Sequence, residues 1–420
     1  MMKSMNGQTL QMRFTQLAFG LCVIAFACII LSPNLANKIM NIAGLIAFFV
    51  AVFNLKNARR NETFWLCLVL FVIGICDLIW YRLFKIDHSE AINSYRAYLE
   101  VGKICVSGAF LIYIFSLGEK FRLGNNKIHY LLVLILQIMM VAYAYYQKIH
   151  LGAARIEFSL AGGTSATGAA YTIVFLSCYM IMVLQHSTLR MKDLLILAHF
   201  FITFIIVVAT ETRAAIMVYP ILFAGMLAIR CYRQRHIPWK GIGVLLFAVA
   251  AGAFMMKDSL IQRYHDLNSD MSAYEKNNTD TSVGARLAMW QTGLAAAKEN
   301  YLWQSTDHRN AIIKDLVKKD PGLEGALPYI PGHLHNEVIE ALSTKGPSGL
   351  LLYVLFVISL AWYALRKIKS FTLFAFLVAM VMFGLSGVMF YSKTTPTAWM
   401  LTLVMFIVFL TQNRHRDIVK

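Results

Sequence analysis

Long apolar runs separated by short polar segments make up most of this chain. Each run is about 17–20 residues long, the length at which an α-helix crosses the hydrocarbon core of a bilayer. Backbone polar groups in lipid must be paired within the segment, and the runs are too long for barrel strands, so we expect an all-α polytopic membrane protein. The pattern predicts twelve spans, over residues 14–32, 39–55, 63–84, 99–118, 128–146, 168–186, 193–210, 213–230, 239–256, 347–365, 371–389 and 396–412. The first run lacks a convincing cleavage site and is predicted to be a retained anchor rather than a signal peptide.

One long polar segment interrupts this pattern, over residues 257–346. Three stretches inside it have apolar residues at helical spacing: SVGARLAMWQTGLAAAKEN with Ser282 as a candidate cap, HRNAIIKDLVKKD, and LHNEVIEALSTKG ending at Gly346. We therefore expect three parts. They are nine transmembrane helices in residues 1–256, a large helical loop in 257–346, and three more transmembrane helices with the C-terminus in 347–420.

The composition is that of a membrane protein, and the placement of the basic residues excludes one class of function. The chain is 58% hydrophobic with mean hydropathy +0.59, and charged residues are 15% of it, against about 25% in soluble domains. The net charge of +17 resides mainly in short loops between the apolar runs. No Lys- and Arg-rich tract with interleaved aromatic residues occurs, which excludes a nucleic-acid-binding protein.

The placement of Lys and Arg predicts the orientation. Loops and termini on one side of the predicted spans hold 20 of these residues, and the short loops on the other side hold 8. Cytoplasmic loops carry the excess of positive residues, so both termini are predicted to be cytoplasmic. Nine spans precede the loop at 257–346, which places it on the outer side of the membrane.

The loop ends in a cluster of polar residues, His333, His335, Asn336, Glu337 and Glu340, of which the two histidines and the two glutamates are titratable. His333 and His335 stand at positions i and i+2, which do not share a helix face. Neither an H-E-x-x-H nor a C-x-x-C motif occurs, so no metal site is predicted. A single imidazole titrates near neutral pH and suits proton transfer, which makes His335 a candidate general base. The alternative is that both histidines are ordinary surface residues.

Two arginines are candidates for binding an anion. Arg213, in VVATETRAAIMVYP, lies at the outer end of an apolar helix, where a charge is costly and often functional. The alternatives for it are an interfacial position with its charge in water, or an ion pair with Glu211. Arg286, in VGARLAMW, is predicted in the first turn of a loop helix, where the helix dipole and a planar guanidinium both favour phosphate.

Two further polar features lie within or beside the apolar runs. Asp77, in GICDLIWY, falls near the outer end of the third predicted span, where carboxylates are uncommon. The segment AGGTSATGAAY, residues 161–171, ends at Tyr171 and offers glycines and hydroxyls that a ligand could approach closely. Either feature could equally serve close packing between membrane helices.

Several of these stretches resemble a known family. GARLAMW, TETRAAI, TGAAY, DLIWYRLFK and especially HLHNEVIEALSTKG are similar to segments of the O-antigen ligases of enteric bacteria. The H-N-x-x-x-E segment is shared with the wider O-antigen ligase and polymerase superfamily of membrane glycosyltransferases. The layout of about twelve helices with one large periplasmic loop is also similar, and implies a GT-C-like fold.

The resemblance implies a reaction and a set of roles. Such ligases transfer O-antigen from undecaprenyl diphosphate to the outer core of lipid A-core, without a metal ion or other cofactor. By the resemblance, His335, Arg286 and Arg213 would be catalytic, with His335 as general base and the arginines holding the diphosphate. His333 is a second match to the H-L-H segment, and the family pattern alone assigns no role to Asp77 or Tyr171. Together with Asn336 and Glu337, these three residues are the candidates for contacting the substrates. Glu337 or Glu340 is a candidate for orienting His335. The protein would reside in the bacterial inner membrane with its site facing the periplasm.

Three alternative functions remain open from the residues alone. An O-antigen polymerase would use the same donor with a second lipid-linked glycan as acceptor, and its clamp and base would look identical. A transporter of lipid-linked oligosaccharide would be expected to carry broken helices and charges near the bilayer midplane, whereas polar residues here gather at the outer face. A docking role for the loop would make its histidines dispensable. The oligomeric state is not indicated.

Overall fold

The fold is known from a computed structural model that describes residues 2–117, 126–158, 165–235, 239–255, 281–392 and 394–419, with residues 257, 261, 269, 270, 272 and 279 between them. The described residues form helices joined by turns. The helices are α1 (Met2–Cys28), α2 (Pro33–Val52), η1 (Leu55–Arg60), α3 (Phe64–Phe84), α4 (Ile92–Ser116), α6 (Asn126–Tyr145), η2 (Tyr146–His150), α7 (Ala166–Gln185), α8 (Lys192–Ala209), α9 (Arg213–Gln234), α10 (Trp239–Met255), α12 (Ser282–Glu299), α13 (Thr306–Lys319), η3 (Pro321–Ala326), α14 (Glu337–Trp362), η4 (Tyr363–Lys367), α15 (Phe371–Ser386) and α16 (Thr395–Val419).

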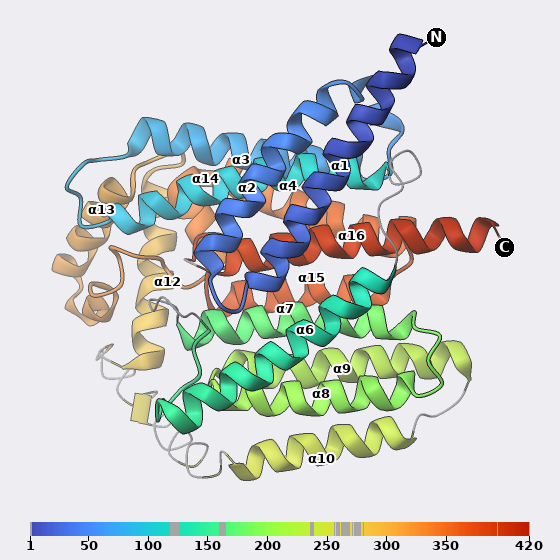
Figure 1. Ribbon diagram of the computed structural model, residues 1–420. Coiled ribbons are helices and arrows are strands. Elements are labelled where there is room, and N and C mark those ends of the chain that lie inside the picture. The colour runs from blue at the N-terminus through green and yellow to red at the C-terminus, as the bar shows by residue number, and fades with distance from the viewer. Residues whose placement is uncertain are drawn as a thin grey trace.

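The prediction of an all-α polytopic membrane protein is confirmed. Among the described residues, 10 helices are long and apolar enough to cross a membrane. The shorter apolar helices Trp239–Phe254 and Phe371–Ser386 coincide with the ninth and eleventh predicted spans. Figure 1 shows the spanning helices lying roughly side by side, with both termini at the end of the bundle away from α12 and α13.

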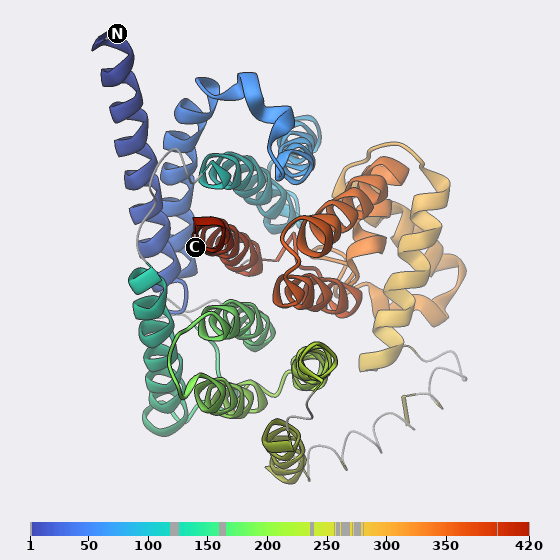
Figure 2. The same ribbon diagram turned by 90° about the vertical axis from the view of Figure 1, so that its right-hand side faces the viewer.

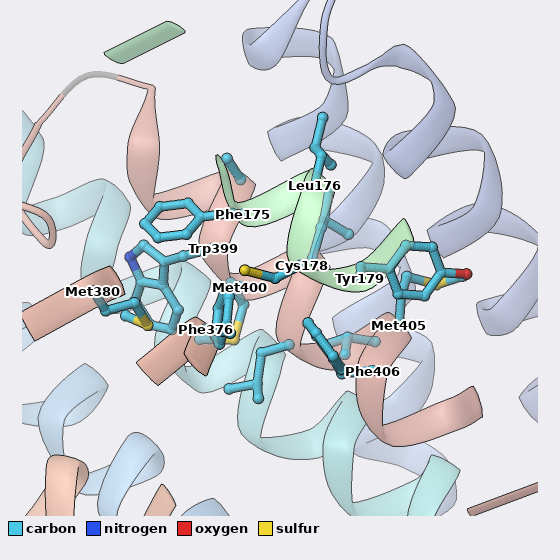
Figure 3. Packing of buried hydrophobic residues seen from close by; sticks show 14 of the residues in the cluster. Phe175, Leu176, Cys178, Tyr179, Phe376, Met380, Trp399, Met400, Met405 and Phe406 are labelled. Carbon is cyan, nitrogen blue, oxygen red and sulfur yellow. The ribbon is translucent and has the colours of Figure 1, made fainter. Parts of the chain in front are cut away.

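Two helices form the centre of the bundle. In α7 and α16, 89% and 94% of the residues in the apolar window are buried, against 33–61% in the other spans. Figure 2, which looks along the helices, shows α16 (red) surrounded by its neighbours, and it contacts α1, α2, α4 and α7. Side chains from α7, α15 and α16 pack into one apolar cluster in Figure 3, including Phe175, Phe376, Trp399 and Phe406. The outer helices expose apolar residues, as helices that face lipid must.

The continuously described part of the polar loop, residues 281–346, folds as a small helical unit with its own core. Its helices α12 and α13 stand at one end of the bundle in Figure 1. Apolar residues of α12, α13, η3 and the segment leading into α14 bury one another, namely Ala288, Met289, Ala296, Ile313, Val317, Leu323, Ala326, Ile330, Leu334 and Ile339. Burial of apolar surface away from the membrane stabilises this unit independently of lipid.

Helix α14 connects the loop unit to the membrane bundle. It continues past the predicted end at Gly346, but that residue has φ 59° and ψ −155° and divides α14 into two helical parts. A Cβ at Gly346 would lie 2.1 Å from the carbonyl oxygen of Tyr301, so both the positive φ and this contact require glycine. The predicted break is therefore confirmed, and the part after Pro347 is the predicted tenth span.

Two helices begin at other residues than predicted, and in each the capping residue decides where the helix starts. Helix α2 begins at Pro33, several residues before the predicted 39, because Ser32 caps it and proline suits the first helical position. Helix α12 begins at Ser282, but its cap is Thr281, whose hydroxyl accepts a hydrogen bond from the Gly284 amide at 3.0 Å. Arg286 therefore opens the second turn of α12, not the first.

Candidate functional site

Several helix N-termini converge at the end of the bundle that carries the loop unit. Helices α7, α8 and α9 are consecutive and connected by short segments, so α7 and α9 run in the same direction. Tyr171, near the start of α7, and Arg213, the first residue of α9, thus lie at the same end. Figure 1 shows α12 at that end as well. The fold therefore brings the predicted residues from separate parts of the chain to one end.

The segment carrying His335 has a strained backbone at that residue. His335 has φ 50°, in the left-handed region that residues other than glycine rarely adopt. The next residue, Asn336, caps α14 by accepting hydrogen bonds from the amides of Val338 at 3.0 Å and Ile339 at 3.2 Å. The ring of His335 is partly buried and lies edge-on to Tyr329, with 5.9 Å between the ring centroids. Such strain persists only where the surroundings hold the residue in place.

A buried carboxylate, that of Glu340, provides much of this support. Its Oε2 accepts a hydrogen bond from the Leu334 amide at 3.0 Å, between the two histidines. Its oxygens also accept bonds from Arg309 Nη1, both at 3.1 Å, and from the Tyr98 hydroxyl at 3.0 Å. The Nδ1 atom of His333 lies 3.9 Å from Oε1, within ion-pair range but too far for a hydrogen bond.

Close packing against α12 fixes the same segment from the other side. Leu334 is fully buried and lies in the core of the loop unit. A Cβ at Gly293 of α12 would come within 2.5 Å of Leu334 Cδ1 and 2.7 Å of Ile339 Cγ2. Glycine at this position thus lets α12 approach the histidine segment, and with it the part of α12 that carries Arg286.

Arg286 is exposed, and its charge acts on two other predicted residues, His335 and Tyr171. The pKa of His335 lies below its usual range, because burial disfavours the charged ring and the charges of His333 and Arg286 add to this effect. Glu340 acts in the opposite direction. The net shift favours the neutral imidazole, which is the form able to accept a proton.

Tyr171 of α7 is fixed by contacts with α15. Its ring stacks on Phe383 with 4.0 Å between centroids and 11° between planes. Its hydroxyl lies 3.2 Å from Ser386 Oγ. The glycine-containing segment before it, predicted as 161–171, is described only from residue 165, and residues 161–164 lie outside the described part of the chain.

Two other candidates, Asn336 and Glu337, are engaged by the protein itself. Besides capping α14, Asn336 donates from Nδ2 to the Leu385 carbonyl at 3.3 Å. Glu337 is buried, and its Oε2 accepts hydrogen bonds from the amides of Met389 at 2.5 Å and Phe390 at 3.2 Å. Glu337 therefore holds the segment after α15, whereas Glu340 holds the histidine segment.

Asp77 is fully buried and forms an ion pair with Lys345 of α14. The ammonium of Lys345 also lies 2.5 Å from the Tyr391 hydroxyl and 5.1 Å from the centre of the Tyr98 ring. Since the Tyr98 hydroxyl bonds to Glu340, this one tyrosine joins both buried ion pairs. The arrangement ties α3 and α4 of the membrane bundle to α14, the helix that follows the candidate base.

Three important residues of this site were missed in the sequence, namely Arg309, Tyr98 and Lys345. Arg309 had a signal, because Ile313 and Val317 follow it at intervals of four on the buried face of α13. A charged residue in such a row needs a buried partner. Tyr98 and Lys345 had no comparable signal, since their partners come from other helices.

The chemistry available here is proton transfer beside a bound anion. A neutral, partly buried imidazole can take a proton from a hydroxyl. An exposed guanidinium near a helix N-terminus can hold a diphosphate. The carboxylates of Glu337, Glu340 and Asp77 are buried, and each accepts at least one hydrogen bond from a protein group.

The chain is similar to known proteins over most of its length. A family model described as O-antigen ligase matches residues 198–354, which include Arg213, Arg286 and His335. The chain is 29% identical over 401 residues to the O-antigen ligase of Escherichia coli (strain K12), covering 94% of each protein. It is also 28% identical over 134 residues to an uncharacterised protein of Haemophilus influenzae, covering 31% of this chain and 33% of that protein.

Proposed function

Because the chain belongs to the O-antigen ligase family, we propose that it transfers O-antigen glycan from undecaprenyl diphosphate to a hydroxyl of the outer core of lipid A-core. The observation that carries this proposal is that the segment matching the family contains Arg286 and His335, and that α12, which carries Arg286, packs closely against the segment that carries His335. We place this multi-pass protein in the bacterial inner membrane. The excess of 20 Lys and Arg over 8 supports cytoplasmic termini and a periplasmic site.

In the proposed reaction the acceptor hydroxyl attacks the anomeric carbon of the glycan. The bond from that carbon to the diphosphate oxygen breaks, and undecaprenyl diphosphate leaves with the electron pair. His335 takes the proton of the hydroxyl, which is the step that a neutral imidazole can assist. The reaction needs no nucleotide or other cofactor, since the glycan is already activated by its diphosphate.

The two arginines are proposed to hold the negative charge that grows on the departing diphosphate. Arg286 is exposed on α12, which packs against the histidine segment, and Arg213 begins α9 at the same end of the bundle. Two guanidinium groups can neutralise this negative charge without a metal ion, and their planar forks match phosphate oxygens. His333 and Tyr171 are proposed to contact the substrates at the edges of the same group.

Asn336, Glu337 and Asp77 are proposed to position the site rather than to touch substrate. Each is buried and bonded to protein groups, as described above. A buried side chain whose hydrogen bonds are satisfied by the protein would lose them on turning toward a ligand, at a cost of about 1–3 kcal/mol per group. This assignment differs from the expectation that the same three residues contact the substrates.

The acceptor distinguishes a ligase from a polymerase, and complementation tests it. In a bacterial strain lacking its own O-antigen ligase, we expect this chain to restore the ladder of O-antigen on lipid A-core in lipopolysaccharide gels. A polymerase-deficient strain should not be restored. Failure in the first strain with rescue of the second would identify the chain as a polymerase instead.

Replacing either Arg213 or Arg286 by lysine should lower the transfer rate by roughly 10²-fold, although the charge is kept. Lysine lacks the planar two-point contact with phosphate, and removing one preorganised donor at a developing anion costs about this much. The measurement is ligation by the purified protein with lipid-linked donor and lipid A-core acceptor.

The matched control is Lys298→Arg, an exposed position further along α12 that should leave the rate unchanged. Wild-type rates in both Arg213→Lys and Arg286→Lys would argue against a diphosphate clamp. A loss confined to Arg286→Lys would remove Arg213 from the clamp.

A further inference from the structure

A cleft of about 310 Å³ lies between helices at the end of the bundle opposite the candidate site. It is lined by the ends of α7 and α9 and by the starts of α8 and α15, all of which lie near the C-terminal end of the bundle in Figure 1. Its volume is at the lower end of the range of about 300–1,000 Å³ found for small-molecule sites. A group the size of a phosphate with a small alcohol fits such a space.

The charge of the lining is strongly positive. Among the described residues that line the cleft, Lys192, Arg230, Arg233 and Lys369 carry fixed positive charges, and Asp193 is the one carboxylate. Asp193 forms an ion pair with Arg230 at 2.7 Å and balances one of the four charges. Helix dipoles nearly cancel here, because α7 and α9 end at the cleft while α8 and α15 begin there. The side chains therefore determine the sign of the field.

The walls of the cleft are built from contacts between distant segments. Thr372 of α15 donates a hydrogen bond to Gln185 Oε1 of α7 at 2.9 Å. The guanidinium of Arg233 stacks over the ring of Phe371, 4.5 Å from its centre, which holds the charge at the rim. Lys369 stands in the turn before α15 with φ 56°, a left-handed conformation that is rare for lysine.

We propose that this cleft binds a phosphate-bearing anion, supplied either by the headgroup of an anionic phospholipid or by free phosphate. Basic residues that only set the orientation of a membrane protein need no cleft between helices. A basic pocket between helix ends at the membrane surface is the arrangement that binds anionic headgroups. The cleft is distinct from the proposed transfer site, because the spanning helices separate the two.

The test uses the full-length protein in detergent and native mass spectrometry. Phosphatidylglycerol, phosphatidylcholine and inorganic phosphate are added separately, and phosphate is also added in competition with phosphatidylglycerol. We expect phosphatidylglycerol to bind more tightly than phosphatidylcholine. Lys192→Gln combined with Lys369→Gln should weaken this binding by at least about tenfold, since each basic residue near the surface contributes to attraction of anionic lipid. Displacement by inorganic phosphate would identify free phosphate as a source, and resistance to it would identify the lipid headgroup.

The matched control combines Arg59→Gln with Arg366→Gln, which are exposed basic residues that do not line the cleft. This control should bind as the wild type does. Equal binding of the two phospholipids with no binding of phosphate would overturn the proposal, and so would equal losses in the control and in the cleft variant. If thermal unfolding shows the cleft variant to be misfolded, Arg233→Gln combined with Lys369→Gln gives the same comparison with a different pair.

Discussion

Replacing His335 by alanine is expected to lower glycan transfer by about 10²–10⁴-fold, the usual contribution of a general base. The ring is partly buried, and its segment packs against α12, which carries Arg286. Its backbone has a left-handed φ between two fixed points, the Asn336 cap and the hydrogen bond from the Leu334 amide to Glu340. An unstable backbone geometry at a single residue indicates that the position of its side chain matters. The measurement is the rate of ligation by purified protein, alongside lipopolysaccharide gels from complemented cells.

A second histidine of the loop unit provides the control. His308 is exposed on α13 and takes no part in the network around Glu340, so His308→Ala should transfer glycan at the wild-type rate. Membrane insertion and thermal unfolding of His335→Ala should match the wild type, because the ring is at the edge of the loop core. A wild-type O-antigen ladder from His335→Ala would remove this residue from the mechanism.

The pH dependence of the rate gives an independent readout of the same role. The pKa of His335 is lowered by burial and then by the charges of His333 and Arg286, so the free imidazole should persist below the usual pH. The wild-type rate should fall only as the pH drops through this lowered pKa, where the ring gains a proton. In Arg286→Gln one of the lowering charges is absent, so the acid limb of the residual activity should move to higher pH. An acid limb at the same pH in both proteins would contradict the role of His335 as base.

The positions of the membrane-spanning helices along the chain could largely be predicted from sequence, because lipid imposes the same requirement on every span. A helix must satisfy its own backbone in the hydrocarbon, so length and hydrophobicity alone indicate where it lies. The errors fell at helix ends, where one side chain decides. Ser32, the last residue of the first predicted span, caps α2, which starts at Pro33 between the first two predicted spans, and Thr281 rather than Ser282 caps α12.

The candidate site could be predicted only in part, because its framework is held by contacts between distant residues. His335 lies just before the cap of α14 and Arg286 in the second turn of α12, where the local sequence already indicates a candidate polar group. The local sequence does not indicate the residues that hold this framework together, because the members of each pair are far apart in the chain. Arg309 is 31 residues from Glu340, and Asp77 is 268 residues from Lys345. Asp77 was noticed because carboxylates in apolar helices are rare, but its partner depends on how α3 packs against α14.

Breaking the buried pair of Arg309 and Glu340 is expected to destabilise the loop unit by about 3–5 kcal/mol. Both side chains are 0% exposed, and Arg309→Met would leave the carboxylate of Glu340 charged without its cation. The same helix provides a control in Lys318, which is 77% exposed and pairs with Asp315 at 2.8 Å. Lys318→Met should change stability by less than about 1 kcal/mol, as exposed pairs do. The free energy of unfolding of both variants is measured in denaturant, with limited proteolysis of the loop as the probe of unfolding.

The double replacement of Arg309 and Glu340 by methionine separates stability from positioning. Removing both charges avoids a lone buried ion, and apolar replacements of buried pairs are often tolerated, so much of the lost stability should return. The Leu334 amide would then lack the Glu340 oxygen that it bonds to at 3.0 Å, and the segment between the two histidines would lose its anchor. Glycan transfer should therefore remain low even in the restabilised protein. If the rate recovers together with stability, the buried pair serves folding alone, and the geometry of His335 is maintained by the cap at Asn336 and the packing of Leu334.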